Sequence, residues 1–306
     1  MTDQRQPDIV VGVLLMAGAA LIFAAMHALI RFAAAELHPF EIAFFRWFFG
    51  AIFLIPFIVR GRAAIWKTPH LKLHLSRAVM TAGATCVWFS ALTLMPLAQA
   101  TALSFTIPMF TTVGAALFLH EHVGLRRWTA TLFGFFGVLI ILRPGVADIS
   151  AVSLLPIVAA VLVAYNLNVI KFTGRTDSTE TVVVYNTVLS TPLTAIPMLF
   201  VWQTPSPSAL AILALLGLLA TVAHFLLTKA FTYGDASALV SVDYLRLPFI
   251  ALIGFLFFAE IPDIWTWIGG AVIAGATIYI ARREAKLARL REDVTDKAAS
   301  KPAGTV

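Results

Sequence analysis

Apolar and polar positions along this chain fall into long blocks, without the short alternation of a soluble helix or strand. About ten mostly apolar stretches are each long enough, as a helix, to cross the ~30 Å hydrocarbon layer of a bilayer. Short junctions rich in Pro, Gly and polar residues separate them. The stretches cover residues 9–35, 42–59, 75–94, 98–119, 128–142, 152–172, 182–202, 210–228, 236–258 and 265–281. This pattern predicts an all-α membrane protein with ten transmembrane helices.

Basic residues lie almost entirely on one side of these predicted spans. Of the 22 Lys and Arg residues, 18 fall in the two tails or in the even-numbered junctions or within three residues of them, whereas only Arg143 lies in an odd-numbered junction. By the positive-inside rule, both termini are expected in the cytoplasm and the protein in the inner membrane. Residues 1–8 would form a short cytoplasmic N-terminus, and residues 284–306 a basic cytoplasmic tail.

Composition excludes most other classes of protein. Hydrophobic residues make up 60% of the 306 positions and charged residues only 12%, with a mean hydropathy of +0.89. A soluble domain needs a more polar surface than this. The net charge of +6 is spread over short junctions, so we expect no nucleic-acid partner. The single cysteine, Cys86, cannot form an internal disulfide or, alone, a thiolate metal site.

The two halves of the chain resemble each other. The first half has Pro108 inside a span that ends near Glu121, and a Gly-rich helix follows. The second half repeats this order with Pro248 and Glu260, displaced by about 140 residues along the chain. Five spans separate the copies, so they must cross the bilayer in opposite directions. We therefore predict two inverted five-helix repeats, residues 9–145 and 146–283, whose interrupted helices meet near the bilayer midplane.

Charged residues inside the spans are candidates for function or for structural pairing. Asp243 and Arg246 lie three residues apart and close enough to pair, because each unpaired charge would cost ~2.5–3.5 kcal/mol or more at a helix centre. A self-neutralising structural pair and a substrate or proton site both stay open. Pro108, Pro248, Glu121 and Glu260 join this pair as candidate coupling or gating residues. For the two glutamates, a structural role such as capping the N-terminus of the next helix is favoured over a gate contact.

Other polar residues inside the spans are candidate substrate ligands. His27 and Arg31 share one helix face, and Arg46 follows in the next span, although both arginines could instead reach the interface by snorkelling. Packing or helix bridging is the structural alternative for the remaining candidates. The full predicted set of substrate-binding residues is His27, Arg31, Arg46, Trp88, Tyr165, Asn168, Tyr185, His224 and Tyr244.

Catalytic motifs are missing from the sequence. His120-Glu121-His122 lacks the two histidines four apart that a zinc protease helix requires. There is no P-loop, nucleophile elbow or dinucleotide fingerprint. We expect no cofactor, no metal and no enzyme activity. An intramembrane enzyme or a receptor stays as an alternative of a different class.

Several segments together resemble the EamA type of the drug/metabolite transporter superfamily. They are FFRW at 44–47, LMPLAQATA at 94–102, FLHE at 118–121, GFFGV at 134–138 with LRP at 142–144, and GFLFFAEIPD at 254–263. The resemblance covers residues 9–283. It implies two inverted five-helix repeats around a central cavity, with helices 5 and 10 peripheral, and an ATP-independent carrier of small metabolites that works by alternating access. His27 stands where an acidic residue is expected in many similar proteins.

These observations favour a secondary transporter for a polar or zwitterionic metabolite with an anionic portion. Arg46, with His27 and Arg31, would supply the positive pole, while Trp88, Tyr165 and Tyr185 would supply stacking surfaces. The runner-up is a proton-linked exporter of cationic or amphipathic compounds that uses Asp243 as its titrating group. The expected partners are a small-molecule substrate and membrane lipid, and homodimerisation is left open.

Overall fold

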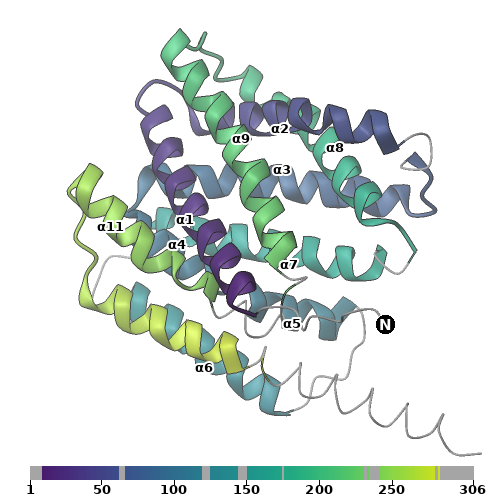
Figure 1. The fold of residues 1–306 in the computed structure, drawn as a ribbon. Coiled ribbons are helices and arrows are strands. Elements are labelled where there is room, and N and C mark those ends of the chain that lie inside the picture. Colours follow the sequence, from purple (N-terminus) through teal and green to yellow (C-terminus); the bar gives the residue numbers. More distant parts are fainter. Residues whose placement is uncertain are drawn as a thin grey trace, which may run out of the picture.

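A computed structural model describes residues 9–61, 66–118, 125–143, 150–173, 176–230, 233, 242–279 and 282 (Figure 1). All regular secondary structure in these residues is helical. Seven helical stretches in the described residues are long and apolar enough to cross a membrane, one of them the broken stretch Leu97–Leu117, and three shorter apolar helices accompany them. The protein is thus an all-α, multi-pass membrane protein.

The helices follow the predicted spans closely. In the first half they are α1 (Ile9–Ala33), α2 (Pro39–Gly61), α3 (Leu71–Leu94), α4 (Leu97–Ser104), α5 (Ile107–Phe118) and α6 (Leu125–Leu142). In the second half they are η2 (Ala151–Leu154), α7 (Leu155–Thr173), α8 (Thr179–Leu199), α9 (Pro207–Ala230), α11 (Arg246–Phe258) and a last helix, Ile264–Tyr279. The one predicted span at 98–119 is divided into α4 and α5, and the first part of the span at 236–258 lies outside the described residues.

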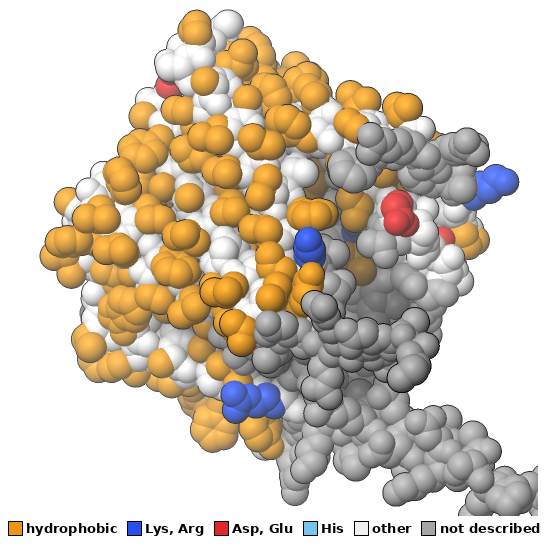
Figure 2. All heavy atoms as spheres, viewed as in Figure 1, with side chains coloured by type: hydrophobic (Ala, Val, Ile, Leu, Met, Phe, Trp, Pro, Cys, Tyr) orange, Lys and Arg blue, Asp and Glu red, His pale blue; other side chains and the backbone are white. Residues whose placement is uncertain are grey.

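Apolar side chains cover the outside of the bundle, as a lipid environment requires. Figure 2 shows hydrophobic side chains over most of the described face, with few charged ones among them. Helices approach one another through small residues: Ala19, Ala20 and Ala24 on α1 are fully buried. Because lipid tails are as apolar as the helices, this close packing replaces the hydrophobic effect as the main cause of helix association.

The main helix contacts between the halves have equivalents in which the two halves have swapped roles. α1 packs against α9, and its counterpart α7 packs against α3 (Figure 1). α2 packs against both α8 and α9, while α8 packs against both α2 and α3. Each half therefore contributes equivalent helices to a shared core.

The loops between these helices also make equivalent contacts in the two halves. Between α1 and α2, Glu36 accepts hydrogen bonds from the Ser206 backbone N–H and hydroxyl, at 2.7 and 2.8 Å, just before α9. Between α7 and α8, Asp177 accepts one at 2.8 Å from the Thr68 hydroxyl, just before α3. An acidic residue after the first helix of each half thus holds the start of the third helix of the other half.

Two glycines let α6 and the last helix cross closely. A Cβ atom on Gly137 would lie 2.8 Å from the Gly269 carbonyl oxygen, and one on Gly269 would lie 2.6 Å from the Gly137 carbonyl oxygen. No larger residue fits either position without moving the backbones apart. These two helices therefore pair directly, one from each half.

Candidate functional site

A cavity of about 310 Å³ lies between the two halves of the bundle. Its walls come from α1, α2, α3 and the α4–α5 break of the first half, and from α7, α9 and α11 of the second. The polar lining residues are His27, Arg46, Thr81, Thr85, Ser104, Asn166, His224 and Arg246. The aromatic lining residues are Phe23, Trp47, Trp88 and Phe89. A concave apolar site with a few convergent polar groups is the usual form of a small-molecule site.

Two helix breaks bring backbone turns to the cavity wall. Pro108 lies second in α5, and α4 ends at Ser104, four residues before it. Pro248 lies third in α11, and the chain turns at Tyr244 and Leu245, immediately before that helix. A proline ring clashes with the carbonyl four residues earlier, so each helix must stop there. The matching breaks place Ser104 and Arg246 in the cavity wall.

Arg46 provides a positive charge to the cavity wall, and no carboxylate among the described residues neutralises it. Its guanidinium lies over the Trp47 ring, 3.9 Å from the ring centroid, and forms no ion pair within the described part of the chain. Trp47 is held in turn, because its Nε1–H donates to the Thr85 hydroxyl at 3.1 Å and that hydroxyl donates to the Thr81 carbonyl at 2.8 Å. The cation therefore rests on a fixed aromatic platform.

Arg246 supplies a second positive charge from the other half. It forms an ion pair with Asp243, three residues before it, and its guanidinium lies 5.5 Å from the Phe23 ring centroid and 5.7 Å from that of Phe105. Asp243 itself does not line the cavity. The described lining thus holds two arginines and two histidines but no Asp or Glu. Such a wall attracts an anionic or electron-rich group.

His27 completes the aromatic wall on α1. Its ring meets Trp88 edge to face, with ring centroids 5.4 Å apart, and its buried Nδ1 has no hydrogen-bond partner in the described structure. His224 meets Phe23 in the same manner at 5.5 Å, and its Nδ1 lies 2.7 Å from the Ala220 carbonyl oxygen. Four rings from α1, α3 and α9 thus form one side of the cavity.

The cavity gathers some of the predicted site residues and leaves others elsewhere. Of the nine predicted substrate ligands, His27, Arg46, Trp88 and His224 line it, together with the predicted coupling residue Arg246. The sequence allowed Arg31 and Arg46 to extend to the membrane interface. In the structure, Arg46 lies in the cavity wall and Arg31 forms an ion pair with Glu260. Glu121 lies outside the described residues.

Three predicted ligands connect neighbouring segments of the bundle and do not line the cavity. The Tyr165 hydroxyl bonds the Ser76 hydroxyl at 2.9 Å, and the Tyr185 hydroxyl donates to the Trp66 carbonyl at 2.9 Å. Asn168 donates from its side-chain amide to the Ala164 carbonyl at 2.9 Å and, across to α5, to the Thr111 carbonyl at 3.3 Å. These contacts correspond to the bridging alternative that the sequence also allowed.

A fourth predicted ligand also lies outside the cavity. Tyr244 packs edge to face against Phe105, with ring centroids 4.5 Å apart, so the two helix breaks touch through these side chains. Neither residue lines the cavity.

Asn166 is the main lining residue that the sequence analysis missed. It lies on the cavity face of α7, with its Oδ1 buried and unpaired in the described structure. Small or apolar residues share this face at helical spacing: Pro156, Ala159, Ala160 and Val163. The helical spacing of this face continues to Asn166 and not to Asn168. This spacing was the feature of the sequence that could have identified Asn166 as a cavity residue.

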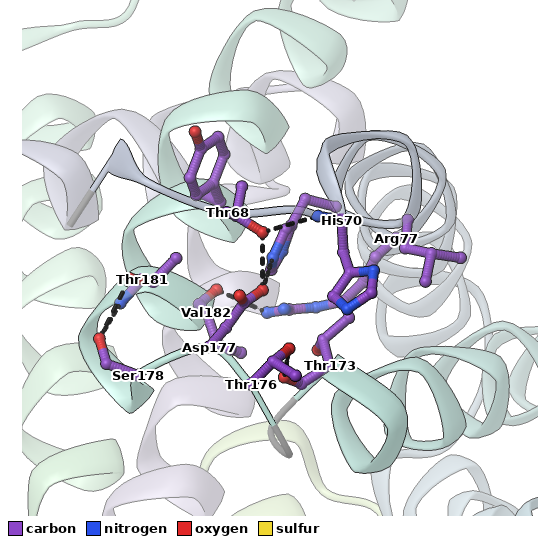
Figure 3. Close-up of polar contacts among 12 residues, drawn as sticks. Thr68, His70, Arg77, Thr173, Thr176, Asp177, Ser178, Thr181 and Val182 are labelled. Atoms are coloured by element: carbon purple, nitrogen blue, oxygen red, sulfur yellow. Dashed lines mark hydrogen bonds and ion pairs between the residues drawn. The ribbon is translucent and has the colours of Figure 1, made fainter. Parts of the chain in front are cut away.

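A second polar cluster lies at the opposite end of α3 from its junction with α4 (Figure 3). Asp177 accepts from the Thr68 hydroxyl and lies 2.8 Å from His74 Nε2, while Arg77 donates to the Val182 carbonyl at 3.0 Å. Burial alone would raise the pKa of Asp177, but the hydrogen bonds from His74 and Thr68 outweigh it and lower that pKa. The cluster joins α3 to the α7–α8 loop and does not line the cavity.

Metal binding finds no support in the described residues, where no three His, Cys, Asp or Glu side chains lie together.

The fold and site define a multi-pass helical protein with a central cavity that both of its halves line. Residues 10–143 and 150–282 each match the EamA-like transporter family. The chain therefore belongs to this family, with the domain present twice.

Known relatives cover most of the chain. It is 35% identical over 283 residues to the riboflavin transporter of Rhizobium johnstonii, which spans 92% of this chain and 94% of that protein. It is 34% identical over 258 residues to the S-adenosylmethionine uptake transporter of Rickettsia bellii, covering 84% and 88%. It is 30% identical over 276 residues to the pseudopaline exporter of Pseudomonas aeruginosa, covering 89% and 96%.

A solved crystal structure has the same fold. It aligns with a TM-score of 0.61 over 89% of this chain and 98% of its own, at 20% identity.

Proposed function

We propose that this protein is a secondary transporter that moves a small polar or zwitterionic metabolite with an anionic portion across the inner membrane by alternating access. The observation that carries the proposal is the cavity wall, where Arg46 and Arg246 come from different halves and no Asp or Glu joins them among the described lining residues. A ligand held there contacts both halves, so it can bias their relative position.

Arg46 is the proposed anchor for the anionic group. Its guanidinium has no carboxylate partner in the described structure, so a carboxylate or phosphate of the ligand can accept its paired N–H donors. Arg246 already carries the Asp243 carboxylate and is the weaker competitor for a ligand anion. Trp88 and Phe23 offer ring faces and edges to an unsaturated portion of the ligand.

The proposed topology has ten spans in two inverted halves, with both termini in the cytoplasm. Exchange of equivalent contacts between the halves supports it, as do the matching breaks at Pro108 and Pro248 and the one-sided distribution of Lys and Arg. The runner-up, proton-linked export of cationic compounds through Asp243, has less support. That carboxylate is paired with Arg246 and does not line the cavity.

Names of the relatives suggest the compounds to test first. One is named for riboflavin and one for S-adenosylmethionine uptake, whereas another is named as an exporter. Purified protein in proteoliposomes should be assayed for counterflow of flavins, S-adenosylmethionine, nucleosides and amino acids, with and without a pH gradient.

The proposal predicts counterflow of at least one compound that carries a carboxylate or phosphate, without chemical conversion. Arg46→Gln should reduce this counterflow at least ~10-fold, since it removes a charge-assisted contact worth ~1.5–3 kcal/mol. Arg143→Gln is the matched control, because Arg143 lies outside the cavity in a partly exposed ion pair with Asp263. Transport restricted to compounds without an anionic group, or recovery of a reaction product, would contradict the proposal.

A further inference from the structure

The start of α4 has no capping side chain of its own. Pro96 occupies the N-cap position and offers no side-chain acceptor. By contrast, Ser178 accepts from the Thr181 N–H at the start of α8, and Asp263 accepts from the Thr266 N–H at the start of the last helix. The Leu97 N–H of α4 instead donates at 2.9 Å to Glu260, which lies 163 residues further along the chain. One half of the protein therefore caps a helix of the other.

The same carboxylate also pairs with a cation on α1. Glu260 forms an ion pair with Arg31, whose guanidinium lies 5.2 Å from the Phe258 ring centroid at the end of α11. The two side chains are 16% and 23% exposed, so water can reach them. Glu41 makes contrasting contacts, because it is completely buried and accepts from the Gln203 and His38 N–H groups. The Glu260 contact can thus open with water replacing its partners, which is much costlier at Glu41.

The end of α11 determines the position of Glu260. α11 ends at Ala259, which adopts the left-handed conformation with φ 53°. This conformation is unfavourable for a residue with a side chain. The Glu260 N–H then bonds back to the Gly254 carbonyl at 3.0 Å, and a Cβ on Gly254 would lie 3.2 Å from the Glu260 carboxylate. Strain of this kind is retained where the surrounding structure requires it, commonly at functional positions.

The contact lies beside the cavity. Arg31 directly follows Ile30, which lines the cavity, and Leu97 precedes the lining residue Ser104 by seven positions on α4, or ~10 Å along a helix. It therefore joins α1, α4 and α11 between the cavity and the end of the bundle where α4 begins. Opening the cavity toward that end separates α11 from α1 and α4, and this requires the contact to break.

We infer that the Arg31–Glu260–Leu97 contact is a latch that closes this end of the cavity, with Glu260 as its gating residue. The inference rests on the proposed alternating access. In the described conformation the latch is shut, and it must open once in each transport cycle. When the latch opens, water replaces the lost hydrogen bonds of Arg31, Glu260 and Leu97. The shut and open states therefore differ by little free energy, and ligand binding can shift their populations.

Cysteine labelling tests the latch without any substrate. Ser104→Cys in a Cys86→Ala background places one reporter thiol in the cavity wall. A membrane-impermeant maleimide is added either to intact cells or to inside-out vesicles. Glu260→Gln should raise the labelling rate from the side where α4 begins by roughly 5- to 150-fold, the range of typical conformational coupling. Labelling from the opposite side should fall.

Two further variants separate a latch from a structural brace. Arg31→Gln removes the ion pair from the other partner, and the Leu97 cap remains in Arg31→Gln and can remain in Glu260→Gln, so Arg31→Gln should also label faster than the parent. Asp263→Asn is the control, because it removes the partly exposed Arg143 pair at the same end yet still caps the last helix. It should label like the parent.

Unchanged labelling of folded Glu260→Gln would overturn the latch, as would an equal rise in Asp263→Asn. Failure of Glu260→Gln, Glu260→Asp and Arg31→Gln to give folded protein by size-exclusion chromatography would identify a brace and also refute it. These readouts do not depend on the substrate. Failure of the proposed cavity chemistry would therefore leave the labelling result unaffected, and the reverse also holds.

Discussion

The ion pair between Asp243 and Arg246 gives a prediction about both stability and transport. The pair spans the turn before α11, and Arg246 reaches from it to the cavity wall between the Phe23 and Phe105 rings. Asp243→Asn would leave the Arg246 charge without its carboxylate. The double variant Asp243→Asn with Arg246→Gln would remove both charges and keep side chains of similar size.

The expected loss of stability follows from burial. Removing one partner of a fully buried pair costs ~3–5 kcal/mol, and an isolated charge at a helix centre costs ~2.5–3.5 kcal/mol. The Arg246 and Asp243 side chains are 21% and 23% exposed, so cavity water screens part of this charge. We therefore expect Asp243→Asn to lower the free energy of unfolding by ~1–3 kcal/mol. The double variant should recover to within ~1 kcal/mol of the parent.

Thermal unfolding in detergent and the yield of monodisperse protein, measured for all four members of the double-mutant cycle, test this expectation. If the pair also serves the transport site, the double variant will be folded but inactive, and substrate binding by each single variant will be lost before its stability is. A structural pair predicts instead that transport recovers with folding. Stability losses that simply add in the double variant would refute the pairing argument. Single variants with full yield and full transport would refute both roles.

Two further predictions concern helix packing and pH. Gly137→Ala should lower the free energy of unfolding by ~1–3 kcal/mol through overlap with Gly269, whereas Gly50→Ala, which meets nothing within 4 Å, should be tolerated; equal unfolding temperatures would contradict this. Because the pKa of Asp177 is lowered in the folded protein, its stabilising contribution is complete above the usual carboxyl pKa of ~3.9 and is lost as pH falls through the lowered value. Asp177→Asn should therefore unfold at a lower temperature than the parent at pH 6, with the difference shrinking toward pH 3; a difference that grows on acidification would contradict the assignment.

Hydrophobic patterning predicted the helices well because ~20-residue apolar segments have few other uses. Two further features could be predicted from the sequence because local backbone geometry determines them. They are the helix breaks near Pro108 and Pro248 and the pairing of Asp243 with Arg246. Such features depend on residues close together in the sequence.

Choosing which polar residue faces the cavity needed tertiary information. Asn166 and Asn168 are two positions apart on α7 and point to different sides, but polarity alone does not tell them apart. The partners of Glu260 could not be predicted from the sequence either. Leu97 lies in the other half of the chain, and nothing in the sequence near α4 indicates that a distant residue caps this helix. Apolar spans in lipid constrain helix length much more than helix rotation.

Ligand-induced stabilisation of the purified protein tests most directly whether Arg46 binds an anionic group in the cavity. Compounds are compared in matched pairs that differ in one anionic group: S-adenosylmethionine with its decarboxylated form, flavin mononucleotide with riboflavin, and amino acids with the corresponding amines. In at least one pair, the anionic member should raise the unfolding temperature more, Arg46→Gln should abolish the difference, and Arg143→Gln should retain it. Equal stabilisation by the members of every pair that binds, or an undiminished difference in Arg46→Gln, would show that Arg46 does not bind the anionic group.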